Sequence, residues 1–147
     1  MSAELLSTNE TALAQTYRLQ EELLKVSDVE VVTDHVIHGG IYTRTIRLAA
    51  DVVLVGALIK IPTTLVIAGR TAVFTGEEWI ELEGVHIIPA RAGRKQTFRT
   101  RDETTLIMSF RTDAKTVAEA EAEFTDEAEQ LVSQRAGEHD TITITGE

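Results

Sequence analysis

Residues 52–75 read VVLVGALIKIPTTLVIAGRTAVFT, and this stretch decides the fold class of the chain. Apolar and β-branched residues alternate through most of it, a pattern typical of half-buried β-strands. The tripeptide Ala68-Gly69-Arg70 predicts a tight connection between two strands, because glycine adopts a positive φ without steric cost. The stretch contains no His, Asp, Glu or Cys, the side chains that most often bind a metal ion.

The same short, β-branched pattern continues on both sides of this stretch. Residues 35–40 are expected to form a loop, and residues 75–78 (TGEE) a second tight turn. Short strands at this spacing indicate a sandwich or a barrel. We expect strands at residues 29–32, 41–48, 52–61, 64–68, 71–75, 79–82, 85–89, 96–100 and 105–111.

Two helices and a final strand flank the β region. Ser7 and Glu10 have the spacing of a capping box, and the apolar residues that follow predict a helix over residues 8–26. The apolar period changes again at residue 113 and predicts a second helix that ends near Gly137 and has an acidic outer face. We therefore expect one domain, with a helical arm at 1–33, a β-barrel at 34–112, an acidic helix at 113–136 and a terminal strand within 137–147.

The composition excludes several classes of protein. The chain of 147 residues has no cysteine, which excludes disulfides, thiolate catalysis and zinc–sulfur sites. Its first residues, MSAELLSTNE, lack the features of a signal peptide, and no apolar run approaches the ~18 residues of a membrane span. We expect a cytoplasmic protein that has no membrane partner.

The net charge of −10 is unevenly distributed along the chain. Residues 1–38 carry a net charge of −5, residues 39–112 carry +3, and residues 113–147 carry −8. A basic middle between acidic ends indicates that the ends lie against the middle, within one subunit or between neighbours. The alternative is that the acidic faces are solvated and maintain solubility.

Several motifs resemble the cupin family. The order of a strand pair, a glycine turn, a second pair and a small-residue turn before the last strand is similar to that of cupins. More narrowly, residues 38–44 (HGGIYTR), 56–60 (GALIK), 93–96 (GRKQ) and 102–104 (DET) resemble small cupin-like proteins of phage and prophage genomes. The resemblance covers residues 30–125. It implies a mainly β fold with a single cupin-like double-stranded β-helix, or jelly-roll barrel.

The resemblance also implies where a cupin metal ion would bind, and the chain departs from the pattern there. The glutamate of the first cupin motif falls at Pro62 or Thr63, and the histidines before it fall within residues 55–59, which end at Ile59. The histidine of the second motif falls at Gln96, and a further one falls at Phe110. We therefore expect no metal ion or other cofactor. The alternative metal site consists of three imidazoles, those of His35, His38 and His86.

A cluster of cations lies in the second half of the β region: Arg91, Arg94, Lys95, Arg99 and Arg101. One interpretation is an anion site for a phosphate or a carboxylate, formed by Tyr42, Arg94, Lys95 and Arg99. The other interpretation pairs the cluster with the acidic face of the second helix. The negative overall charge, and the lack of aromatic residues between most of the cations, count against a nucleic-acid partner.

No Ser–His–Asp arrangement, P-loop or dinucleotide turn is recognisable, so we assign no catalytic residue. We expect a noncatalytic, phage-type cupin-like module that acts through homo-oligomerisation or through contacts with phage particle proteins. Its location would then be the host cytoplasm or the virion. The alternative is a small-molecule binding protein or cupin enzyme that holds an anionic ligand or a sugar in the barrel mouth.

Overall fold

The computed structural model describes residues 10–24, 31–74, 76–131 and 140–147. Most of these residues lie in β-strands, and no helix among them is long and apolar enough to cross a membrane. The elements are α1 (Glu10–Leu24), β1 (Val32–His38), β2 (Ile41–Leu48), β3 (Val53–Val55), β4 (Thr63–Phe74), β5 (Trp79–Ala90), β6 (Thr97–Thr100), β7 (Thr104–Arg111), α2 (Val117–Phe124), the 3-10 helix η2 (Ala128–Gln130) and β8 (Thr141–Ile144).

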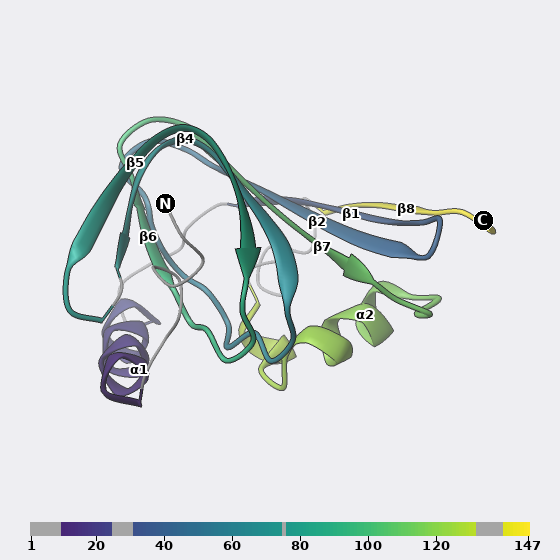
Figure 1. Ribbon diagram of the computed structural model, residues 1–147, viewed down its shortest axis with the longest axis horizontal. Coiled ribbons are helices and arrows are strands. Elements are labelled where there is room, and N and C mark those ends of the chain that lie inside the picture. Colours follow the sequence, from purple (N-terminus) through teal and green to yellow (C-terminus); the bar gives the residue numbers. More distant parts are fainter. Residues whose placement is uncertain (1–9, 25–30, 75, 132–139) are drawn as a thin grey trace.

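The strands form one strongly curled sheet. Their order is β3-β6-β4-β7-β2-β1-β8, and β5 pairs with β4. β4 is central, because its first residues pair with β7, its last residues pair with β6, and β5 runs along its whole length. The long strands arch over, and both α-helices lie on the concave side (Figure 1). This is the expected mainly β, cupin-like jelly-roll fold, in the form of a half-barrel whose interior is the concave face of the sheet.

The predicted chain reversal at Gly69 is wrong, because β4 continues through it from Thr63 to Phe74. β5 likewise runs unbroken where two strands were expected. β4 changes partners at this point, from β7 before Gly69 to β6 after it. Gly69 has a φ of +143°, and a Cβ atom there would lie 2.7 Å from the carbonyl oxygen of Glu103. The glycine therefore allows the close approach of the chain before β7. The other predicted turn is confirmed, since β4 ends at Phe74 and β5 begins at Trp79.

The predicted loop at residues 35–40 is also wrong. Residues up to His38 belong to β1, which forms a hairpin with β2. The connection is only Gly39 and Gly40, whose φ angles of +60° and +74° fit a type I′ turn. Two successive glycines are favoured there because both positions need a positive φ. In consequence His35 faces the concave side and is buried, whereas His38 faces the other side and is exposed.

The second helix is shorter than predicted. α2 begins after Thr116, whose hydroxyl accepts a hydrogen bond from the amide of Glu119. It ends at Phe124, because Thr125 is extended and its hydroxyl accepts a hydrogen bond from the amide of Glu127. The remainder of the predicted helix is the 3-10 turn η2 and residues outside the described ranges. The terminal strand is confirmed: β8 pairs in parallel with β1 of the same chain.

Two apolar clusters fill the concave side. The larger one lies among the strands and contains residues such as Leu54, Ile67 and Phe98. The second lies under α2 and is formed around Tyr42, Phe110 and Phe124. Full burial of an aromatic or aliphatic side chain contributes about 1.5–3 kcal/mol. The second cluster therefore holds α2 against one end of the half-barrel, next to the site described below.

Candidate functional site

The concave interior places three of the four residues at the expected cupin ligand positions close to one another. Ile59 and Gln96 line one internal cavity, and the buried Thr63 hydroxyl accepts a hydrogen bond from Arg94, which also lines it. The fourth residue, Phe110, packs against Tyr42 and Phe124 in the cluster under α2. An alkyl group, a hydroxyl, a carboxamide and a phenyl ring do not form a metal-binding set, since first-row metal ions need imidazole, carboxylate or thiolate ligands. The residues present therefore do not fit the metal ion that the cupin family implies.

The internal cavity is small and mainly apolar. Its volume is about 90 Å³. Pockets that hold drug-sized ligands enclose roughly 300–1,000 Å³, so this cavity is too small for a sugar or a cofactor. Three polar side chains reach it, those of Arg44, Arg94 and Gln96. Its apolar wall consists of Ile46, Leu54, Val55, Ala57, Ile59, Leu65, Phe98, Leu106, Met108, Phe124 and Leu131, with the backbone of Gly56.

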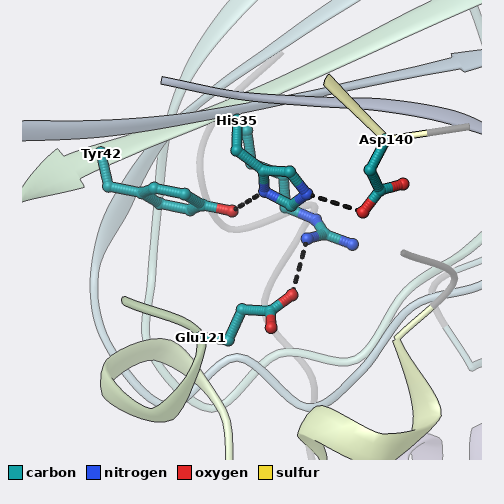
Figure 2. Close-up of polar contacts among 5 residues, drawn as sticks. His35, Tyr42, Glu121 and Asp140 are labelled. Carbon is teal, nitrogen blue, oxygen red and sulfur yellow. Dashed lines mark hydrogen bonds and ion pairs between the residues drawn. The ribbon is translucent and has the colours of Figure 1, made fainter. Parts of the chain in front are cut away.

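The first of the interior cations, Arg44, is paired with a carboxylate of α2. Its Nη1 atom lies 3.3 Å from Oε2 of Glu121, and both side chains are at most 4% exposed (Figure 2). The guanidinium also lies over the ring of Phe124, 5.8 Å from its centroid. Desolvating two charges is costly, and an ion pair in the interior is tolerated only while both members are present. The pair therefore joins α2 to β2, and loss of either charge would disturb the position of α2.

The second interior cation, Arg94, is bound to oxygen atoms of the protein itself. It lies between β5 and β6, and its backbone pairs with that of Ile59. Its guanidinium donates to the carbonyl of Arg91 at 2.7 Å, to the carbonyl of Ile61 at 3.5 Å, and to the hydroxyl of Thr63. Burial lowers the pKa of Arg94 to about 10, and the group is still charged at neutral pH. These acceptors lie in two segments, residues 61–63 and Arg91, so Arg94 holds the chain at the start of β4 against the turn after β5.

A third set of polar contacts joins β1, β2 and the residue just before β8. The Nδ1 atom of His35 lies 2.8 Å from the hydroxyl of Tyr42, and Nε2 lies 3.0 Å from Oδ2 of Asp140 (Figure 2). Burial raises the pKa of Tyr42, so its hydroxyl stays protonated. Both ring nitrogens of His35 are therefore engaged in hydrogen bonds, one with a hydroxyl and one with a carboxylate. His35 and Tyr42 are buried and neither lines the cavity, so this chain of hydrogen bonds anchors β8.

Glu127, just after α2, connects three distant parts of the chain. Its carboxylate accepts hydrogen bonds from the Tyr17 hydroxyl of α1 at 2.6 Å, from the Leu58 amide at 2.8 Å and from the Lys95 ammonium at 2.9 Å. The Lys95 ammonium lies 4.5 Å from the centroid of the Tyr17 ring, a cation–π contact. Burial lowers the pKa of Lys95, and Glu127 opposes that shift. Lys95 is therefore a structural cation that holds α1 against the half-barrel.

This arrangement predicts acid sensitivity that depends on Glu127. Burial alone would raise the pKa of its carboxyl, but the hydrogen bonds from Tyr17, Leu58 and Lys95 outweigh burial and hold the pKa below its usual 4.5. The carboxylate therefore stabilises the fold fully above the pKa of the unfolded chain, and this contribution is lost as pH falls through the lower pKa of the folded state. Glu127→Gln should show a smaller loss of unfolding free energy between neutral and acid pH than the unmodified protein.

Denaturant unfolding at a series of pH values measures this effect. The matched control is Glu129→Gln, which removes an exposed carboxylate nearby and should leave the pH profile unchanged. Identical profiles for the Glu127 variant and the unmodified protein would contradict the role given to this carboxylate.

The structure does not bring the three histidines of the alternative metal site together. His35 and His38 point to opposite faces of β1, and His38 contacts the Thr145 hydroxyl. His86 lies on β5, which β4, β7 and β2 separate from β1, and it contacts the Glu83 carbonyl. Among the described ranges, no group of three or more His, Asp or Glu side chains is placed to hold a metal ion.

The four residues of the predicted anion site are likewise separated. Tyr42 is buried beside His35, Arg94 points toward Thr63, Lys95 points toward Glu127, and Arg99 is exposed on β6. The predicted contact between the cations and the acidic helix occurs at one point, the ion pair of Lys95 and Glu127 just after α2. Arg101 pairs with Glu81 of β5 instead.

Sequence reasoning missed the most buried carboxylate of the site. Glu121 was not assigned to the apolar face of the second helix, although it lies on the same side as Val117 and Phe124, four residues after one and three before the other. An acidic residue within an apolar helical stripe predicts a buried ion pair, and this signal was present in the sequence. The partner, Arg44 on β2, could not be identified without the tertiary structure.

Comparisons with known proteins find only distant similarities, to solved structures that include cupin-domain proteins. No family model matches the chain, and no curated protein matches it. Ectoine synthase from P. lautus matches 67% of this chain and 75% of that chain, with 12% identity and a TM-score of 0.47. A Cupin_2 domain of an XRE family transcriptional regulator from Enterobacter cloacae matches 57% and 98%, with 10% identity and a TM-score of 0.44. An RmlC-like cupin protein from Desulfovibrio desulfuricans matches 54% and 81%, with 19% identity and a TM-score of 0.42. These similarities include cupin-domain proteins and are too distant to transfer an activity.

Proposed function

We propose that the protein is a noncatalytic cupin-fold module that acts through protein contacts, with homo-oligomerisation as the first of them. The observation that supports this proposal is the interior of the half-barrel. The positions where a cupin would hold its metal ion carry Ile59, Thr63, Gln96 and Phe110, and the cavity that Ile59 and Gln96 line is about 90 Å³. An interior built in this way stabilises the fold, so the function resides on the outer surface.

The polar groups of the interior support the same proposal. Arg44 is paired with Glu121, Arg94 donates to three oxygen atoms of the protein, and Lys95 is paired with Glu127. A ligand that recruited any of these cations would have to break an existing contact, which costs free energy unless the ligand replaces it fully. These cations therefore serve the stability of the fold.

The setting that we propose is a phage-encoded particle or its assembly in the host cell. This part rests on the resemblance of residues 38–44, 56–60, 93–96 and 102–104 to small cupin-like proteins of phage and prophage genomes. Capsid or tail genes beside the gene of this protein would support it. Genes of a sugar or amino-acid pathway would contradict it.

Elemental analysis tests the noncatalytic role. Protein prepared without chelators should contain zinc, iron, nickel and manganese far below one ion per chain, because the interior offers no metal-binding set. One ion per chain that survives dialysis and raises the melting temperature would overturn the proposal.

A small anion in the cavity is the competing function, because Arg44 and Gln96 both line that space. Added acetate, phosphate or citrate should leave the melting temperature unchanged beyond the effect of matched ionic strength. A saturable rise in melting temperature that disappears in Arg44→Met would favour the anion-binding function over the one proposed.

A further inference from the structure

In the part of the chain that the structure describes, three strands of the sheet have an edge without a partner strand, and these edges differ in length and in what covers them. β3 lies at one end of the sheet and contacts α1. β8, at the other end, has only the four residues Thr141–Ile144. β5 extends over twelve residues and, among the strands that the structure describes, pairs only with β4, so its other edge has no partner within the described ranges. A long open edge presents unpaired N–H and C=O groups that another strand can bind.

The outer face of β5 is apolar in its middle and charged at its ends. Val85 is 69% exposed and Ile87 is 71% exposed. Ile87 lies beside Val66 of β4, which lies beside Ile107 of β7, so the apolar surface continues across three strands. Glu81 and Glu83 precede the apolar pair, and Pro89 and Arg91 follow it on the same face.

We propose that β5 pairs antiparallel with β5 of a second copy of this chain, about a twofold axis at His86; this inference rests on the proposed role in protein contacts. In this register Val85 lies opposite the partner's Ile87, and Glu81 lies opposite the partner's Arg91. Each contact occurs twice, as a twofold interface requires. The charge order along β5, acidic before the axis and basic after it, is complementary to itself only when the two strands run antiparallel.

One neighbouring register is disfavoured by the side chains of β5. A shift of the pairing toward the start of β5 places Glu83 opposite the partner's Ile87, which desolvates a carboxylate against an alkyl group. Pro89 has no N–H group and removes one ladder bond at each end of the pairing. The ladder is therefore centred on residues 83–89, and an interface of this small size gives a weak dimer. Pairing of β5 with β8 of another copy would join two different surfaces, so each copy would keep one surface free and successive copies would build a filament.

Disulfide trapping tests the register directly, because the chain has no cysteine of its own. Only residue 86 lies opposite itself, and the Cα atoms of an antiparallel pair are about 4.5–5.5 Å apart, within the range of a disulfide. His86→Cys should become a covalent dimer under mild oxidation. The matched controls are Ile142→Cys, on the other open edge, and Ile87→Cys, one position from the axis; both should remain largely monomeric on a denaturing gel.

Sedimentation equilibrium from micromolar to submillimolar concentration gives the second test. The unmodified chain should show twice the monomer mass at the highest concentration, and Val85→Lys/Ile87→Lys should weaken the dimer by more than about tenfold. Ile142→Lys/Ile144→Lys adds the same charge at the β8 edge, where these side chains are 56% and 46% exposed, and should keep the dimer. Arg91→Glu should weaken the dimer, because it places a carboxylate opposite the partner's Glu81.

The outcomes separate this inference from the proposed function. A monomer at every concentration overturns the β5 dimer. An oligomer that the β5 substitutions leave intact, or one that the β8 substitutions dissociate, overturns it too, while the proposed role in protein contacts stands. A stoichiometric metal ion in the interior overturns the proposed function and leaves the result of the cross-linking experiment unaffected.

Discussion

Replacing Glu121 by alanine is expected to lower the free energy of unfolding by about 3–5 kcal/mol. The reason is the charge that remains behind. Arg44 is 4% exposed and pairs with Glu121 across the gap between β2 and α2. Without the carboxylate, the guanidinium has to stay charged in a largely apolar interior or move toward solvent and disrupt the packing of Phe124. Either response costs much more than the loss of an exposed ion pair.

Chemical denaturation of three variants tests this expectation. Glu129→Ala removes an exposed carboxylate from the same region and should change stability by less than about 0.5 kcal/mol. Arg44→Met/Glu121→Leu replaces both charges by apolar groups and should recover most of the loss, because a buried pair contributes little beyond its own desolvation. A loss below about 1 kcal/mol for Glu121→Ala would show that Arg44 does not depend on this carboxylate.

The second large effect is expected at Gly69. Replacement by alanine should lower the free energy of unfolding by about 3 kcal/mol or more, because overpacking and backbone strain act together. The new Cβ atom would lie 2.7 Å from the carbonyl oxygen of Glu103 and 2.8 Å and 2.9 Å from Oγ1 and Cα of Thr104. Two of these three atoms belong to the backbone, so rotation of one side chain cannot relieve the contact. The φ of +143° at this position adds strain for any residue with a side chain.

Gly93 provides the matched control. It has a φ of +80°, but a Cβ atom there would meet nothing within 4 Å. Gly93→Ala should therefore cost only the backbone strain, about 1–2 kcal/mol. Equal losses for the two variants, measured by denaturant unfolding, would show that the close approach at Gly69 is relieved elsewhere in the structure.

Local sequence patterns were sufficient for the fold class. The β-branched alternation of residues 52–75 and their neighbours predicted a mainly β chain, because side-chain period depends only on residues next to one another in sequence. The TITIT alternation likewise predicted β8, and the capping spacing predicted α1. The cupin-like form, and the motif positions at Ile59, Thr63, Gln96 and Phe110, were implied by the resemblance to cupins.

The tertiary structure decided how each local signal is used. Gly69 was predicted to reverse the chain, yet β4 passes through it, since hydrogen bonding to β7 and then to β6 outweighs the local preference for a turn. Residues 35–38 were predicted as loop and form β1, because pairing with β2 and β8 satisfies their backbone.

The polar contacts of the interior depend on the tertiary structure in the same way. The pairs of Arg44 with Glu121, Lys95 with Glu127 and His35 with Asp140 join residues 77, 32 and 105 positions apart. No local pattern specifies which distant charge meets which. By itself the sequence therefore determined the mainly β class, the terminal strand and the presence of a helix on each side of the β region. Only the tertiary structure decided which cations are buried and paired in the interior, and which strand edge has no partner among the described residues.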